Sequence, residues 1–254
     1  MDWHLDTAVA CALYGLLMGQ LVPGLIARVP EPEDPDVEEL EAGAPRDGDD
    51  PATPVTPVAE EPKELYVDIA RSRGLGWKAS VATAVIAGLM GAAVGWSPAL
   101  SFLLYLAPVG VALAVIDWRT RLLPTKVIAP SYLVVGALAA VSAWSESDLD
   151  ALITAGLGWL VAGGTFFLLW FIYPRGMGYG DVRLSGVLGI ALGYLGWSEL
   201  LVGVYAGFIL GGVGGALLSL LRLVDRKAYP FGPFMLVGAV VGVLLGPYVA
   251  DWYA

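Results

Sequence analysis

The sequence predicts an all-α polytopic membrane protein with about eight transmembrane helices, both termini outside and one long disordered cytoplasmic loop. Of the 254 residues, 57% are hydrophobic and only 15% are charged, which is more apolar surface than a soluble domain of this length buries. Apolar runs of about 17–23 residues recur along the chain, the length that crosses a bilayer as a helix. Backbone polar groups in lipid must be satisfied within their own segment, so we expect these runs to be helical.

The eight expected helices lie at about residues 7–28, 79–96, 98–116, 127–144, 150–173, 182–196, 199–221 and 232–250. The sixth is too short to cross a bilayer unless it begins in the glycine-rich stretch before it, which would place Asp181 on its first turn. No basic residue precedes the first run and no A-x-A sequence follows it. We therefore interpret this run as a retained helix and not as a cleaved signal peptide.

The basic residues predict the direction of the chain through the membrane. With the N-terminus outside, all 14 Lys and Arg residues fall on the cytoplasmic side, and the acidic stretch SESDLD (145–150) lies on the other. This distribution follows the positive-inside rule. An error of one helix in the count would scatter these charges over both sides.

Three regions follow from this layout: a first transmembrane helix (1–30), an acidic, proline-rich cytoplasmic loop (31–76) and a seven-helix membrane domain (77–254). The net charge of −10 is local, because residues 31–68 hold 14 of the 24 acidic residues. Such a composition cannot bury enough apolar surface to offset its ordering entropy, so we expect most of this loop to be disordered. No cluster of basic residues indicates nucleic-acid binding.

Isolated residues elsewhere favour packing over chemistry. The only cysteine, Cys11, lies in an apolar run, and the only histidine is His4, so neither a disulfide framework nor a zinc site can be assembled. We interpret Cys11 as a buried packing residue. Glycines recur every four residues in the seventh helix, a pattern that lets a neighbouring helix approach closely, at positions 203, 207, 211 and 215.

Two carboxylates stand out at the cytoplasmic ends of helices. Asp117 ends the third helix in LAVIDWRTRLLPTKV, and Asp181 opens the sixth in GMGYGDVRL. Carboxylates at the membrane boundary are costly, so a functional role is the default hypothesis. The alternatives are that Asp117 pairs with Arg119 or Arg121 and that Asp181 caps its own helix. A third acid in these loops, Asp225 in RLVDRK, is explained by solvated ion pairs.

If Asp117 and Asp181 meet, their chemistry is specific. Two neighbouring carboxylates hold one proton between them, so the ionised member can take a proton from water while the neutral member donates to a carbonyl oxygen. The preceding glycines would give the backbone conformations closed to other residues and let a substrate strand approach. Pro124 is expected to start the fourth helix, where its missing N–H does no harm.

In these motifs the chain resembles prepilin peptidases, members of the GxGD family of intramembrane aspartic proteases. The family's G-x-G-D, followed by a basic residue and Leu, stands here as GYGDVRL (178–184), and its first aspartate motif stands as DWRTRLLP (117–124). A third feature, PFGPF, occupies residues 230–234, and the first helix contains the similar GQLVPGLIARVP (19–30). The order of these motifs within an eight-helix layout makes the resemblance specific.

The resemblance implies an aspartic endopeptidase with Asp117 and Asp181 as the catalytic pair. It would remove the basic leader from type IV prepilins or from pseudopilins of secretion systems, just before a hydrophobic helix. The expected location is the bacterial inner membrane, as a multi-pass protein whose site faces the cytoplasm and whose partners are these substrates and the bilayer. The supporting residues of the site would be Gly176, Gly178, Gly180, Pro124 and Arg183.

The chain departs from the family in two places. Many members also methylate the new N-terminus with S-adenosylmethionine and carry a loop with two C-x-x-C pairs that bind zinc, but the loop here has no cysteine. In the first helix, Gln20, Pro23 and Ala27 replace the family's Ser, Asn and Tyr. We therefore expect no metal and no cofactor; S-adenosylmethionine would be one only if methyl transfer is retained. The acidic loop either attracts the basic leader or is a plain tether.

Three other functions fit parts of the sequence. A proton-coupled transporter with paired aspartates would place them near the middle of helices, whereas Asp117 and Asp181 lie at ends. A non-catalytic pilus or secretion assembly protein would not need both aspartates and the glycines. A protease of the presenilin or signal-peptide-peptidase kind would carry a tyrosine before its first aspartate, where this chain has Ile116. A phosphate-binding loop is the other use of GMGYG, and it is disfavoured because the stretch lacks a preceding strand and a following Lys-Ser/Thr.

Overall fold

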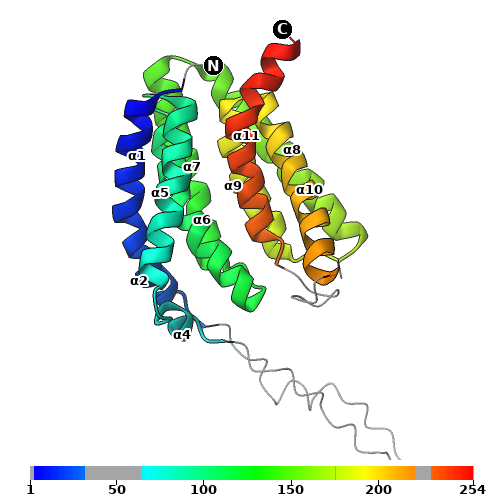
Figure 1. Ribbon diagram of the computed structural model, residues 1–254. Coiled ribbons are helices and arrows are strands. Elements are labelled where there is room, and N and C mark those ends of the chain that lie inside the picture. The colour runs from blue at the N-terminus through cyan, green and yellow to red at the C-terminus, as the bar shows by residue number, and fades with distance from the viewer. Residues whose placement is uncertain (1–2, 32–63, 175, 221–229, 254) are drawn as a thin grey trace, which may run out of the picture.

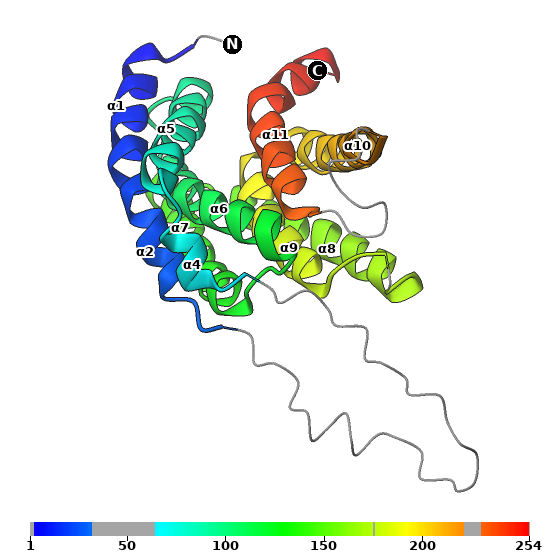
Figure 2. The same ribbon diagram turned by 60° about the horizontal axis from the view of Figure 1, so that its bottom comes forward.

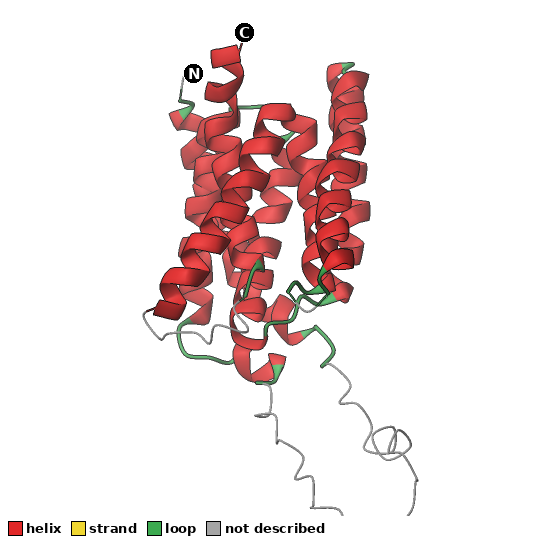
Figure 3. Ribbon diagram, turned by 90° about the vertical axis from the view of Figure 1, so that its right-hand side faces the viewer, coloured by secondary structure: helices red, strands yellow, loops and turns green. Residues whose placement is uncertain are grey.

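The computed structural model describes residues 3–31, 64–174, 176–220 and 230–253, and for 216–219 and 253 it describes the backbone only. Throughout these ranges the chain forms helices and loops without strands (Figure 3). In chain order the helices are α1 (Leu5–Met18), η1 (Gly19–Leu21), α2 (Val22–Ala27), α4 (Tyr66–Ala70), α5 (Leu75–Val94), α6 (Leu100–Thr120), α7 (Thr125–Glu146), α8 (Leu149–Ile172), α9 (Tyr179–Leu195), α10 (Trp197–Leu220) and α11 (Gly232–Tyr253).

All eight predicted membrane helices are present. Seven segments in the described ranges are long and apolar enough to cross a bilayer, and the first of them joins α1, η1 and α2 into Leu5–Ala27. The eighth is α9, which has 17 residues and begins at Tyr179, so Asp181 lies on its first turn as expected. The predicted third helix was too short, because α6 continues to Thr120 and ends where Arg121 adopts a left-handed conformation (φ 57°).

The helices run side by side, with both chain ends at one end of the bundle and α4 at the other (Figure 1). A chain that runs along the bundle an even number of times begins and ends at the same end of it, as this one does. Seen closer to the helix axes, α9 lies between the group that contains α6 and α7 and the group that contains α8 and α11 (Figure 2). It packs against α7, α8, α10 and α11. Most of its residues are buried, as expected for a helix that is apolar on all sides.

Small residues make the closest helix crossings. A Cβ atom added to Gly189 of α9 would lie 2.5 Å from the carbonyl oxygen of Gly158 in α8, and one on Gly238 of α11 would lie 2.6 Å from the Cα atom of Gly207 in α10. Only glycine permits these approaches. The predicted glycine stripe on α10 therefore has its partner in α11, which contacts it at Gly203 and Gly207, and Gly211 makes room for Phe231 just before α11.

The end of the acidic loop is ordered against the bundle. The short helix α4 packs on α2 and α6 with Tyr66 and Ile69 buried. Glu31 accepts a hydrogen bond from the Val67 N–H (3.2 Å), so the two ends of the acidic segment meet. Glu64 forms an ion pair with Arg119 (2.9 Å). The rest of the predicted disordered loop, residues 32–63, lies outside the described residues.

Candidate active site

Asp117 lies in the last turn of α6 with its side chain only 5% exposed. The chain turns sharply after it: the Arg121 N–H bonds the Asp117 carbonyl oxygen (2.8 Å), and the Thr120 hydroxyl accepts a hydrogen bond from the Leu122 N–H (3.3 Å). These bonds end the helix one turn after the carboxylate. Asp117 is therefore fixed at the rim of the bundle instead of within a continuing helix.

The Asp117 side chain is held by the start of α11. Its Oδ2 atom accepts a hydrogen bond from the Gly232 N–H (2.9 Å), one of the amide groups that has no partner inside its own helix. The positive end of the helix dipole at this place favours a carboxylate. A Cβ atom on residue 232 would lie 2.8 Å from the same oxygen, so the contact requires glycine.

Asp181 occupies the first turn of α9 and is 7% exposed. Its Oδ2 atom accepts a hydrogen bond from the Gly178 N–H (3.2 Å), which confirms the alternative that Asp181 caps its own helix. Capping does not exclude a partner, because Gly180, the residue before Asp181, lies against Leu123, and Leu123 also lies against the Gly232 whose N–H holds Asp117. The two carboxylates, 64 positions apart in the chain, thus lie on adjoining elements at one end of the bundle.

Leu123 connects the elements that carry the two carboxylates. A Cβ atom on Gly180 would lie 2.6 Å from the Leu123 Cβ atom, and one on Gly232 would lie 3.3 Å from its Cδ2 atom. The segment after α6 thus packs directly against the first residues of α9 and α11. The sequence does not single out Leu123 or the contact that Gly232 makes with Asp117; the only signal for Gly232 is its place in PFGPF.

The expectation about the glycines before Asp181 was wrong in its physical reason. Among the described glycines only Gly74, Gly95 and Gly196 have positive φ, and Gly178 is extended (φ −70°, ψ 141°). Close contact replaces backbone freedom as the reason for glycine here. Gly180 makes room for Leu123, and Gly176 makes room for the ring of Tyr173.

The two other predicted support residues join α9 to α7. Pro124 directly precedes α7 with φ −67°, as expected for a residue that starts a helix. The Arg183 guanidinium lies 4.6 Å from the centre of the Tyr179 ring and donates a hydrogen bond to the Thr125 hydroxyl. Arg183 therefore fixes the start of α9 against the start of α7.

The predicted alternative partner of Asp117 is engaged elsewhere. Arg119 pairs with Glu64, and the Arg121 side chain is exposed. The predicted ion pairs of Asp225 fall outside the described residues. Within the ranges that the structure describes, no three His, Cys, Asp or Glu side chains gather as they would around a metal ion.

These features define a helical membrane protein with a buried pair of carboxylates at one end of its bundle. The chain belongs to the type IV leader peptidase family, whose model matches residues 103–245. That range includes Asp117, Asp181 and Gly232.

Three similar proteins are named prepilin leader peptidase/N-methyltransferase. The one from Aeromonas hydrophila is 33% identical over 177 residues, which cover 66% of this chain and 57% of that protein. The one from Pseudomonas aeruginosa is 28% identical over 175 residues (68% and 59%), and the one from Escherichia coli K12 is 32% identical over 139 residues (52% and 58%). The chain thus spans little more than half the length of these relatives. No solved structure matches it.

Proposed function

We propose that this protein is an aspartic endopeptidase that removes the basic leader peptide from type IV prepilins or pseudopilins. The observation that supports it is that two buried carboxylates from distant parts of the chain lie on adjoining elements at one end of the bundle, where Gly180 and Gly232 both lie against Leu123. Their place at helix ends supports a protease over a proton relay, which needs acids along the path across the membrane. The names of the relatives support the choice of substrate.

The proposed reaction is hydrolysis without a covalent intermediate. The ionised carboxylate takes a proton from water while the water oxygen attacks the carbonyl carbon, and the neutral carboxyl group donates its proton to the carbonyl oxygen. The product of this attack is a tetrahedral diol. Its collapse breaks the C–N bond as the leaving nitrogen takes the proton that the first carboxylate received from water, and the second carboxylate recovers its proton from a hydroxyl of the diol. The N–H groups of Gly178 and Gly232 hold one oxygen of each carboxylate, which leaves the other oxygen for water or substrate.

We place the site at the cytoplasmic face of the bacterial inner membrane. The positive-inside distribution supports this orientation, because the basic residues of the described loops lie at the end of the bundle that carries α4, Asp117 and Asp181. A basic leader would remain on that side while its apolar helix enters the membrane.

Coexpression with a candidate prepilin tests this function. Asp117→Ala and Asp181→Ala should each lower the cleavage rate by about 10²–10⁴-fold or more, because each removes one half of the acid–base pair. Asp68→Ala, an exposed acid of α4, is the control and should cleave like the parent. Full cleavage by either active-site variant would refute the assigned role. The mass of the product is expected to show no added methyl group.

A further inference from the structure

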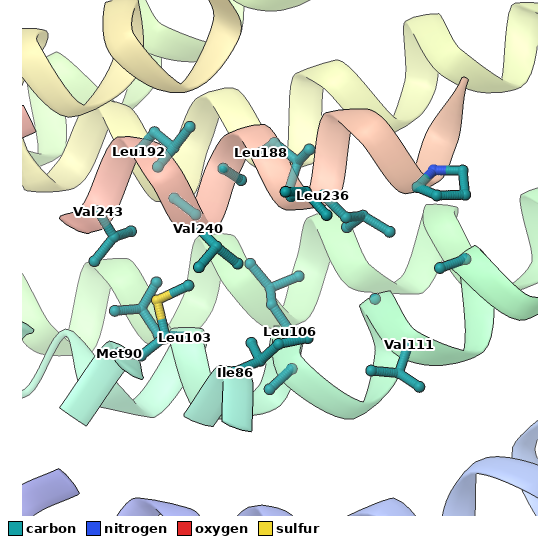
Figure 4. A pocket seen from close by; sticks show the side chains of 17 residues that line it. Ile86, Met90, Leu103, Leu106, Val111, Leu188, Leu192, Leu236, Val240 and Val243 are labelled. Atoms are coloured by element: carbon teal, nitrogen blue, oxygen red, sulfur yellow. The ribbon is translucent and has the colours of Figure 1, made fainter. Parts of the chain in front are cut away.

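A deep apolar cavity lies between α5, α6, α9 and α11. Its volume is about 250 Å³, and its lining contains no charged or polar side chain (Figure 4). Figure 4 shows Leu236 and Val240 of α11 on one side, facing Ile86 of α5 and Leu106 of α6 on the other. For comparison, a cavity of about 150 Å³ takes a benzene ring, so this one has room for about two apolar side chains of leucine size.

The cavity lies on the same helix faces as the two carboxylates. On α6, Gly110 and Ala114 line it, seven and three residues before Asp117, and on α9 Leu188 lines it, seven residues after Asp181. Residues at these spacings share one face of a helix. On α11 the lining begins at Pro233, next to the glycine whose N–H holds Asp117. All three helices that build the site therefore continue into the cavity.

The length of the cavity fits a helical segment of the substrate. Its lining on α6 runs from Leu103 to Ala114, a span of 11 residues or about 17 Å at 1.5 Å per residue, and Asp117 follows three residues later. Small residues on α6, Ala107, Gly110 and Ala114, keep this path open. An apolar helix laid along it would insert one row of side chains and leave its other face to lipid, the usual arrangement of a helix in a groove.

We propose that this cavity is the docking site for the apolar helix that follows the scissile bond of the substrate. The inference rests on the proposed function and adds to it the surface that selects an apolar helix. A helix seated there would end at Asp117 and Asp181, so its first peptide bond would meet the pair. Recognition of the leader alone does not need an apolar cavity whose lining begins three residues from Asp117.

A second surface depression is the structural rival. It lies between α7, α8 and α9 and is lined by Tyr132, Trp159 and Arg183. Neither α6, which carries Asp117, nor α11, which holds it, contributes to its lining. A helix seated there would reach only one member of the pair, and the apolar residues of the substrate would lie beside the Arg183 guanidinium.

Disulfide cross-linking distinguishes the two surfaces. The background is an inactive chain that carries Cys11→Ala and Asp117→Asn. Into it a single cysteine is introduced at one of three places: Val240→Cys in the cavity, Trp159→Cys in the rival surface, or Leu201→Cys on the exposed face of α10. The probe is a full-length prepilin with single cysteines along its apolar helix. We expect the yield of cross-linked prepilin to be at least tenfold higher with Val240→Cys than with Leu201→Cys. The prepilin cysteines that react should be spaced three or four residues apart, on one face of its apolar helix. Preferential capture by Trp159→Cys, or equal capture by all three, would overturn the proposal.

Filling the cavity gives an independent test in the active enzyme. In Gly110→Leu the added side chain meets the flexible end of Leu236, since a Cβ atom there would lie 3.1 Å from its Cδ2 atom. We expect the KM for a full prepilin to rise about tenfold, a change of one decade in affinity. The KM for a substrate truncated shortly after the scissile bond should not change.

Ala137→Leu, on the exposed face of α7, is the matched control and should leave both KM values unchanged. Thermal unfolding of each variant shows whether it folds. An unchanged KM for the full prepilin in folded Gly110→Leu would refute the docking site while leaving the protease function intact. Absence of any cleavage by the parent enzyme would refute both.

Discussion

At the residue scale, the site is built from contacts that only glycine allows. Asp117 and Asp181 are each buried, which opposes ionisation, and each accepts one N–H bond at a helix start, which favours it. The carboxylates could be predicted from the sequence because a charge next to an apolar run is conspicuous. The role of Gly232 could not, because it depends on a contact between residues 115 positions apart.

Gly232→Ala should therefore impair catalysis more than folding. Its Cβ atom would lie 2.8 Å from the Asp117 Oδ2 atom and 3.4 Å from its Cγ atom, so the carboxylate must move. A displacement of about 1 Å can cost about 10²-fold in rate, and we expect a loss of cleavage of that order. The measurement is the cleavage rate in detergent together with thermal unfolding. Gly164→Ala, with no atom within 4 Å of its added Cβ, is the control; equal activity of the two variants would contradict the argument.

At the scale of the elements, glycine-lined crossings set how closely α9 packs on α8 and α11 packs on α10. The sequence predicted the existence of the long apolar helices well, because lipid forces every such run to satisfy its backbone internally. It did not predict α4, which lies in the loop that was expected to be mostly disordered. It predicted the helix ends less well, because α6 runs four residues past the expected 116. The left-handed turn that ends it at Arg121 leads into the segment that packs against the starts of α9 and α11, and these contacts join distant parts of the chain. The expectation that Gly176, Gly178 and Gly180 adopt backbone conformations closed to other residues was wrong for a related reason. A glycine required by a neighbouring side chain looks the same in sequence as one required by its own φ.

The α10–α11 crossing can be tested with a pair of matched substitutions. In Gly238→Ala the added Cβ would lie 2.6 Å from the Gly207 Cα atom and 2.7 Å from the Gly203 carbonyl oxygen, both backbone atoms that cannot yield by a rotamer change. Overpacking of this kind costs about 1–3 kcal/mol, and we expect a lower unfolding midpoint in detergent. Gly212→Ala on the open side of α10 meets nothing within 4 Å and should not lower it. Equal midpoints would show that the crossing tolerates a wider separation.

At the scale of the whole molecule, the membrane domain and the acidic loop differ in kind but are joined at one place. The hydrogen bond between Glu31 and Val67 and the ion pair between Glu64 and Arg119 bring both ends of the acidic segment to the end of α6 that carries Asp117. The composition of the sequence alone predicted an apolar membrane domain and an acidic, proline-rich loop. It did not predict that they meet beside the site, because these bonds join residues 36 and 55 positions apart.

This junction makes the charge of the loop testable without disturbing the bundle. Residues 33–62 contain eleven acidic side chains and one basic side chain, Arg46. Changing the eleven to Gln and Asn keeps the length of the loop and the contacts of Glu31 and Glu64. If the loop attracts the basic leader, this variant should show a several-fold higher KM at about 10 mM salt, where the Debye length is about 30 Å.

The difference should disappear at about 1 M salt, where the Debye length is about 3 Å. Its kcat should equal that of the parent at both salt concentrations, because the carboxylate pair is untouched. A substrate whose leader lysines and arginines are replaced by glutamine is the control and should not distinguish the two enzymes. Equal KM values for the basic substrate at low salt would identify the segment as a tether, since attraction between opposite charges cannot act without raising the encounter rate when screening is weak.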